Sequence, residues 1–220
     1  MHLPKLEELD TDGAIQEYAE QVDGNTRSMF LRKAGLGVGA LAASGGILGA
    51  LPAIARASST DDVAILNFAL TLEFLEAEFY TQAVASGALK DELAQFAKVV
   101  KAHEVAHVAA LKGALGAKAV KKPKFNFKGT TSNPAKFAAT AQVLEDTGVA
   151  AYLGQVGNIK SKTVLAAAGS ILPVEARHAA WIRDINGGRG KNNPAPAAFE
   201  KGKTDKQILA IVKSTGFIVG

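Results

Sequence analysis

The sequence predicts an all-α protein, a four-helix bundle with one long crossover connection between its second and third helices. Three observations favour this fold class. Apolar residues recur at three- and four-residue steps over four long segments, as on the buried face of a helix. Only 6% of the 220 residues are aromatic and β-branched residues rarely alternate, which disfavours a β-sandwich. The connections are short within each helix pair and long between the pairs, as in a bundle with one crossover.

The first two helices are expected at about 60–86 and 91–116. The run Ser59-Thr60-Asp61-Asp62 places cap residues and carboxylates at the start of the first helix, and Ser86-Gly87 ends it. Gly116 ends the second helix. Because the link between them is short, the two helices must run antiparallel.

Residues 117–133 are expected to form the crossover, since they show little periodicity. Within it, the run Lys121–Lys128 interleaves lysines with two phenylalanines, a pattern that nucleic-acid-binding segments also show. We interpret this run as a solvated loop and expect no nucleic-acid partner.

Asn133 followed by Pro134 is a cap residue with Pro at the first helical position, and it predicts a third helix to about Gly157. A fourth helix is expected at about 163–186, and a short apolar helix near 204–214 in the tail. Pro173 lies inside the fourth helix and is expected to kink it just before Glu175. Trp181 is expected to pack in the core.

The first 57 residues are expected to be an N-terminal extension and export signal. An acidic stretch precedes Arg27, Arg32 and Lys33, and the 22 residues 34–55 that follow carry no charge. The run Ala55-Arg56-Ala57 supplies a small-x-small cleavage site and predicts a mature N-terminus at Ser58. An uncleaved anchor is the alternative, because about 20 apolar residues can span a bilayer.

Residues 26–32 resemble the leader pattern of the twin-arginine export route, with Ser28 where the second Arg would stand. The long polar stretch before the motif and the mild hydrophobicity after it favour this route over the general secretory route. We therefore expect an exported protein, in the periplasm or cell envelope of a bacterium, that contacts the membrane only through an uncleaved leader.

The expected regions are the extension and export signal at 1–57, the bundle at 58–190 and a C-terminal tail at 191–220. Cleavage after Ala57 would leave 20 basic and 14 acidic residues, a formal charge of +6. A basic mature protein can meet anionic surfaces.

The residues that carry chemistry repeat between the two halves of the bundle. Helices two and four each contain a Glu-x-x-His unit, whose two side chains lie on one helix face. Helices one and three each contain a Glu followed seven residues later by a Tyr. The distance from that Glu to the next Glu-x-x-His unit is 31 residues in the first half and 30 in the second. The set comprises Glu73, Tyr80, Glu104, His107, Glu145, Tyr152, Glu175 and His178. A pair of metal ions bridged by carboxylates requires such two-fold pseudo-symmetry.

This set resembles the ligands of the ferritin-like di-metal carboxylate proteins, in which a Glu from each of two helices joins a Glu-x-x-His from each of the other two. More narrowly, residues 66–80 resemble the exported ferritin-like domain family that includes desiccation-related proteins. The resemblance covers about 60–186. It implies two iron or manganese ions, iron favoured, and makes Tyr80 and Tyr152 candidate electron donors. The implied ligands are Glu73, Glu104, His107, Glu145, Glu175 and His178.

Glu73 is preferred over Glu76 as the ligand of the first helix. Only Glu73 shares with Glu145 a preceding Leu, a Tyr seven residues later and the distance to the next Glu-x-x-His unit. Glu76 is expected off the centre or beside its ligands. Like Glu78 and Glu92, it could simply be a glutamate that faces solvent on a helix surface. Satisfied core histidines and core tyrosines remain alternatives, and each Tyr ring is expected ~10 Å along the helix axis from its own Glu.

The run His103–His107 also fits His-Glu-x-x-His, the helix of zinc proteases. That interpretation leaves Glu73, Glu145 and the second Glu-x-x-His unit unexplained. With two metals instead, His103 faces ~100° away from Glu104 and is expected beside the ligands or at the surface. His103→Ala is then expected to be nearly silent.

Four Glu and two His form an oxygen-rich environment that suits iron or manganese, and the absence of Cys excludes thiolate-bound metals. The resemblance implies ferroxidase, peroxidase or catalase-like chemistry, with dioxygen, hydrogen peroxide or metal ions as substrates. A non-enzymatic metal-binding or stress-protection protein is the alternative, and a metal that only clamps the bundle is a third. The sequence leaves the oligomeric state open, a homo-oligomer included.

Overall fold

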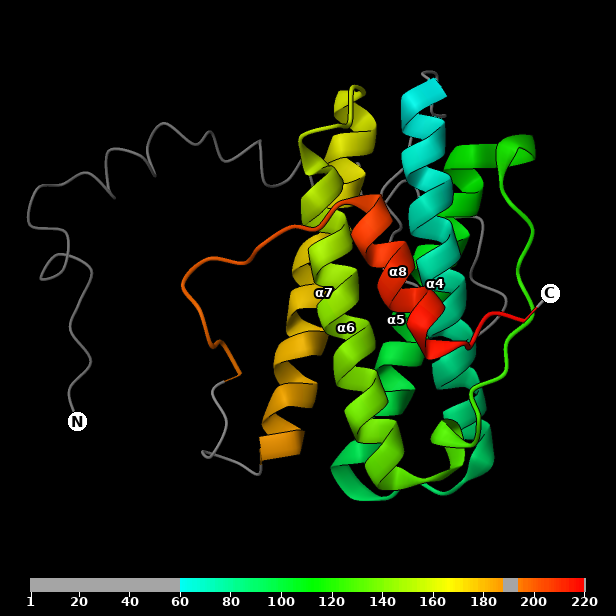
Figure 1. Cartoon of the computed structure of the whole chain (residues 1–220), viewed down its shortest axis with the longest axis vertical. Helices are drawn as coiled ribbons and strands as arrows, with labels where there is room; N and C mark the ends of the chain where they lie inside the picture. Colours follow the sequence, from blue (N-terminus) through cyan, green and yellow to red (C-terminus); the bar gives the residue numbers. More distant parts are fainter. Residues whose placement is uncertain (1–59, 188–193, 220) are drawn as a thin grey trace, which may run out of the picture. The chain divides into compact units, whose positions relative to one another are not determined.

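The computed structural model describes residues 60–187 and 194–219, in which it places five α-helices (Figure 1). They are α4 (Thr60–Ser86), α5 (Asp91–Leu115), α6 (Pro134–Val156), α7 (Lys162–Gly187) and α8 (Asp205–Thr215). Two short 3₁₀ helices, η1 (Gly116–Lys118) and η2 (Thr130–Ser132), flank the crossover. The described residues contain no β-strand, only an isolated bridge between Phe125 and Ile218. The all-α fold class is therefore confirmed.

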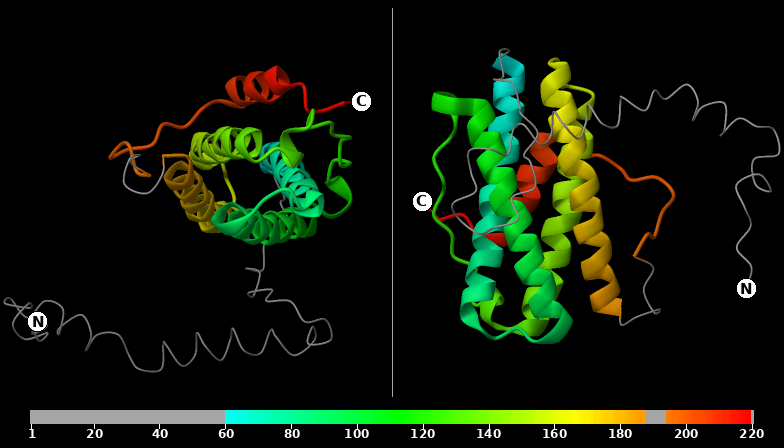
Figure 2. Two further views of the ribbon diagram at one scale, coloured as in Figure 1. Left: turned by 90° about the horizontal axis from the view of Figure 1, so that it is seen from below. Right: turned by 180° about the vertical axis from the view of Figure 1, so that it is seen from behind.

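The four long helices form the bundle. α4 packs along α5 and α6 along α7, and the two pairs meet through narrower contacts of α4 with α6 and of α5 with α7. The left view of Figure 2 shows these helices around a common centre. The crossover from η1 to η2 runs along the outside of the bundle from one end to the other, so that α4 and α6 are antiparallel neighbours (Figure 1).

Local signals in the sequence define the helix ends. The Asn133 side chain accepts a hydrogen bond from the Lys136 amide at 3.0 Å, with Pro134 as the first helical residue, as predicted. Gly87 opens the four-residue link after α4 with a φ of +65°, a conformation that favours glycine. α7 continues through Pro173 without a break and carries Glu175 and His178 beyond it.

The apolar core is divided by position along each helix. One cluster, at the end where α4 passes to α5, includes the aromatic rings of Phe79, Tyr80, Phe96 and Phe137. Trp181 is half-buried against Phe96, with ring centroids 5.3 Å apart. The other cluster is mostly aliphatic and includes Leu70, Leu111, Val164 and Ile171. On α5 and α7 the buried Glu and His residues lie between residues of these two clusters.

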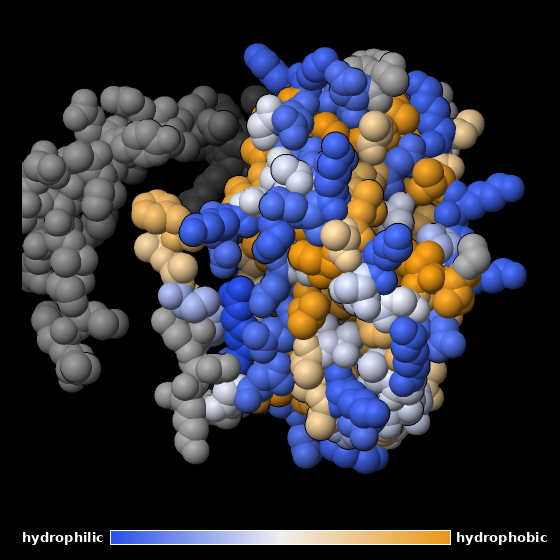
Figure 3. All heavy atoms as spheres, viewed as in Figure 1, coloured by the Kyte–Doolittle hydropathy of each residue, from blue (hydrophilic) through white to orange (hydrophobic). Residues whose placement is uncertain are grey.

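α8 lies outside the bundle against α6 (Figure 2) and buries Ile208 and Val212. Figure 3, which views the face with α8, shows hydrophilic side chains over much of the surface with hydrophobic ones interspersed. The C-terminal segment also pairs with the crossover, where the Val219 amide donates to the Lys124 carbonyl at 2.9 Å.

The basic run of the crossover does not display its aromatic rings. Phe127 is buried and Phe125 is half-buried, and both pack against the core. Lys122 forms an ion pair with Glu78, and the Lys128 ammonium donates to the Thr215 carbonyl at 2.8 Å. These contacts explain the run as part of the fold.

The predicted extension and export signal, with its cleavage site, lies outside the described residues, as do residues 188–193 between the bundle and the tail. None of the helices in the described ranges combines the length and the apolar character needed to cross a bilayer.

Candidate metal centre

Side chains from all four bundle helices converge at the middle of the bundle. Ligand atoms of Glu73, Glu104, His107 and Glu175 lie within 4.8 Å of one another, and the same holds for Glu104, Glu145, Glu175 and His178. Glu104 and Glu175 belong to both groups. The structure thus brings together all six residues that the sequence predicted as ligands, each at most 8% exposed.

Helix periodicity positions these groups. The three-residue spacing puts Glu104 and His107 one turn apart on the inner face of α5, and Glu175 and His178 likewise on α7. α4 and α6 each add one Glu from the opposite side of the bundle. Each half therefore supplies two carboxylates and one imidazole.

The two histidines face several carboxylates with a single ring nitrogen. His107 Nδ1 lies 3.2 Å from an oxygen of each of Glu73, Glu104 and Glu175. His178 Nδ1 lies 3.2 Å from an oxygen of each of Glu104 and Glu145. Since an imidazole nitrogen carries at most one hydrogen, it can serve only one of these acceptors.

Buried atoms in this centre consequently lack hydrogen-bond partners. They are Glu104 Oε1, Glu145 Oε2, both carboxylate oxygens of Glu175, and His178 Nδ1. Unpaired polar atoms are rare in a protein interior because each one costs free energy of desolvation. A cation among them would satisfy several oxygens and a nitrogen at once, so the donor set fits a metal ion.

Burial and mutual repulsion dominate the electrostatics of the acids. Burial raises the pKa of four acids, and the charges of neighbouring carboxylates add to this effect; the four are Glu73, Glu76, Glu145 and Glu175. The pKa of Glu175 reaches about 8. Burial acts in the same direction on Glu104, but its contacts with the two histidines lower its pKa.

Contacts with carboxylates raise the pKa of both histidines. Burial acts to lower the pKa of His178, but its contacts with Glu104 and Glu145 raise it to about 10. The pKa of His107 also rises, because its three carboxylate neighbours outweigh burial. Without a metal, the histidine protons thus provide the positive charge of the centre.

Each tyrosine donates a hydrogen bond to the glutamate of the other half of the bundle. The Tyr152 hydroxyl donates to Glu73 Oε1 at 2.5 Å, and the Tyr80 hydroxyl donates to Glu145 Oε1. The sequence predicted the spacing from each Tyr to its own Glu but not this exchange, which follows from the antiparallel course of α4 and α6. Burial raises the pKa of both tyrosines, so both stay protonated donors at neutral pH.

Two residues depart from the two-fold repeat. Glu76 belongs to neither group of ligand atoms, as expected for a residue off the centre, but it is only 3% exposed, so solvent does not explain it. His103 shares a 2.8 Å hydrogen bond between its Nδ1 and His178 Nε2, and the two rings stack with centroids 5.1 Å apart. His103 belongs to neither group of converging ligand atoms, whereas a zinc-protease helix would direct it to the same ion as His107.

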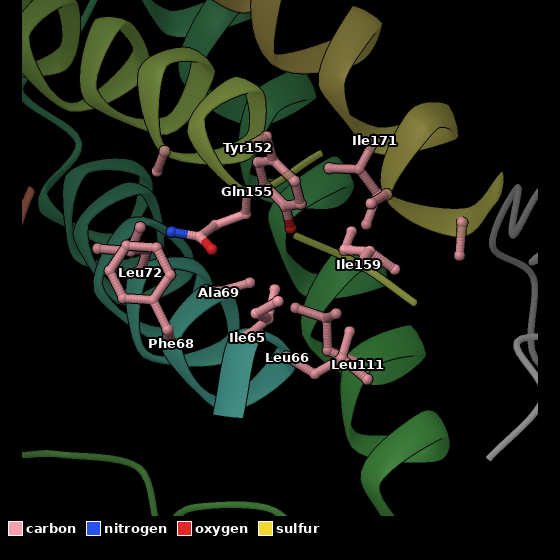
Figure 4. A pocket seen from close by; sticks show the side chains of 13 residues that line it. Ile65, Leu66, Phe68, Ala69, Leu72, Leu111, Tyr152, Gln155, Ile159 and Ile171 are labelled. Carbon is pink, nitrogen blue, oxygen red and sulfur yellow. The ribbon is translucent and has the colours of Figure 1, made fainter. Parts of the chain in front are cut away.

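The surroundings of the two tyrosines differ. Tyr80 is fully buried and packs edge-on against Phe79, Phe96 and Phe137. Tyr152 instead borders a partly open apolar pocket among aliphatic side chains such as Leu66, Leu111 and Ile171 (Figure 4). Tyr152 therefore borders an apolar pocket, whereas Tyr80 is enclosed by aromatic rings.

No curated protein matches this sequence. The family model of the ferritin-like domain matches residues 61–188, which include all of the converging side chains and more than half of the chain. The fold agrees with that match, since α4 to α7 form the bundle with one crossover that such proteins share. The chain therefore belongs to the ferritin-like domain family.

Proposed function

We propose that this protein binds two iron or manganese ions, iron favoured, and uses them in oxidation chemistry with dioxygen or hydrogen peroxide. The observation that carries the proposal is the position of the two Nδ1 atoms, each 3.2 Å from carboxylate oxygens that one hydrogen cannot satisfy. Oxygen-rich sites with two imidazoles suit these metals.

Membership in the two groups suggests the role of each ligand. Glu104 and Glu175 belong to both groups and would bridge the two ions. Glu73 and His107 would complete one ion site, and Glu145 and His178 the other. Four ionised carboxylates would balance the charge of two divalent ions.

When bound, the ions would supply electron exchange with dioxygen or peroxide, in ferroxidase, peroxidase or catalase-like reactions. Tyr80 and Tyr152 would hold Glu145 and Glu73 in place through their hydroxyl groups and are candidate electron donors. The apolar pocket beside Tyr152 would admit an uncharged molecule such as dioxygen.

A metal-binding protein without turnover, of the desiccation-related type that residues 66–80 resemble, is the second candidate. The deep burial of all six ligands favours it, because a bound ion would have little contact with solvent. For either candidate we propose export through the leader at 1–57, by the twin-arginine route, to the periplasm or cell envelope.

Metal analysis of the purified protein tests the site. We expect close to two equivalents of iron or manganese, with His107→Ala and His178→Ala each weakening binding, and Lys98→Ala on the exposed side of α5 serving as the control. A single zinc ion that needs His103 but not His178 would support the protease alternative instead. Consumption of hydrogen peroxide by the loaded protein then separates an oxidoreductase from a binding protein.

A further inference from the structure

Glu76 is a fifth buried carboxylate beside the proposed centre. It lies on α4 one turn beyond Glu73, in the direction of Tyr80, and is 3% exposed. None of the hydrogen bonds among the described residues involves its side chain. Burial of a charged carboxylate costs free energy of desolvation unless a nearby cation or hydrogen-bond donor offsets that cost.

The two-fold repeat shows what Glu76 faces. The repeat relates Glu73 to Glu145 and Tyr80 to Tyr152, so that position 76 corresponds to position 148, which is Gly148. A Cβ atom at Gly148 would lie 3.0 Å from Glu175 Oε2 and 3.4 Å from Glu76 Oε1. The missing side chain on α6 thus leaves the space into which the Glu76 carboxylate points.

The Glu76 carboxylate lies toward one half of the centre. Its neighbour at Gly148, Glu175, belongs to both groups of ligand atoms. Glu76 lies on α4 between Glu73 and Tyr80, and the Tyr80 hydroxyl donates to Glu145. Glu145 belongs only to the group that contains His178. Glu76 is therefore placed beside that group, and α6 offers no equivalent carboxylate for the group of His107.

We infer that Glu76, which lies beside the two groups of ligand atoms and belongs to neither, supports the ion held by Glu145 and His178 as an additional nearby carboxylate, which makes the two ion sites unequal. The inference rests on the proposed two-metal function. A fifth carboxylate beside this ion would add negative charge, which would favour a higher positive charge on the ion.

Titration of the full-length protein with Mn²⁺, or with Fe²⁺ under anaerobic conditions, tests the inference. The wild-type protein should bind two ions with unequal affinities. Glu76→Gln should weaken one of them by about tenfold or more and leave the other unchanged. Glu78→Gln, which alters an ion pair with Lys122 at the surface, is the matched control. Binding of both ions by Glu76→Gln with wild-type affinities would refute the inference.

Combination with histidine variants identifies the ion. In His107→Ala the remaining ion is held by Glu145 and His178, and adding Glu76→Gln should weaken it. In His178→Ala the remaining ion is held by Glu73 and His107, and Glu76→Gln should have no effect. An equal effect in both backgrounds would contradict the assignment. Circular dichroism confirms folding of each variant, and a wild-type protein that binds no ions would refute the proposed function itself.

Discussion

At the scale of single residues, His103 affects the centre through His178. If His178 Nδ1 binds a metal, its Nε2 carries the hydrogen and can donate it to His103 Nδ1, 2.8 Å away. Burial and the neighbouring His178 lower the pKa of His103, so the ring stays neutral and can accept this bond. In the repeat, position 103 corresponds to Val174, which cannot accept one.

We therefore expect His103→Ala to weaken binding of one metal ion by about tenfold, because the orientation of His178 loses its support. This replaces the expectation from sequence that the substitution is nearly silent. Lys101→Ala, two residues away on the same helix, is the control. Isothermal titration with Mn²⁺ measures the effect, and unchanged affinity in His103→Ala would show that the contact between the two rings has no role in binding.

The residue scale also shows what the sequence could and could not predict. The shared spacing to a Tyr favoured Glu73, because corresponding positions in the two halves must lie at the same depth, and the structure places Glu73 in one of the two groups of ligand atoms. The burial of Glu76 was missed, although a signal was present: its counterpart is Gly148, whose missing side chain opens space in the interior. The contact of His103 with His178 depends on the packing of α5 against α7 and has no signal in either helix alone.

At the scale of elements, the four bundle helices were predicted within a few residues, because each has a long apolar face and a clear start or end. The position of α8 was not predicted, since an amphipathic helix at the end of a long connection can pack on many surfaces. Gly154, in the last turn of α6, allows the segment before α8 to pack closely against α6. A Cβ atom there would lie 1.9 Å from the Lys203 carbonyl oxygen.

The backbone before α8 thus crosses α6 at Gly154, where the nearby Lys203 amide donates to the Ala150 carbonyl at 2.9 Å. We expect Gly154→Ala to displace this segment and destabilise the protein by about 1–3 kcal/mol, as overpacking does. Gly157→Ala has open space around it and should change stability by less than about 1 kcal/mol. Urea denaturation measures both variants, and hydrogen exchange should show faster exchange in α8 for Gly154→Ala alone. Equal stability of the two variants would contradict the close crossing.

At the scale of the whole molecule, the buried centre links stability to pH and metal. In the metal-free protein the pKa of Glu175 rises from 4.5 to about 8, and that of His178 from 6.5 to about 10. A raised pKa means that folding favours the protonated form. The resulting stabilisation is full below the unfolded pKa and is lost as the pH rises through the folded pKa. Both groups therefore predict declining stability from about pH 5 to pH 9.

The lowered pKa of Glu104 does not oppose this trend in that range. Its contribution is complete above the ordinary pKa of 4.5 and is lost only in more acidic solution. Metal binding as proposed would reverse this dependence of stability on pH. The ions would displace protons from the carboxylates and from both Nδ1 atoms, so the affinity for metal would grow as the pH rises. The metal-free and the loaded protein should therefore differ least near pH 5 and most near pH 9.

We accordingly expect the melting temperature of the chelator-treated protein to fall between pH 5 and pH 9, while that of the protein loaded with Mn²⁺ falls less or rises. The free energy of unfolding of the metal-free form should fall by on the order of a few kcal/mol. One group whose pKa differs strongly between the folded and unfolded protein is enough for such a loss. Differential scanning calorimetry at fixed ionic strength measures both curves. The variant Glu175→Gln cannot ionise at this position, so its metal-free form should lose less stability over the same range. A metal-free protein that becomes more stable toward pH 9 would show that the buried acids are not held in their protonated forms, and the electrostatic basis for a metal at this centre would then be wrong.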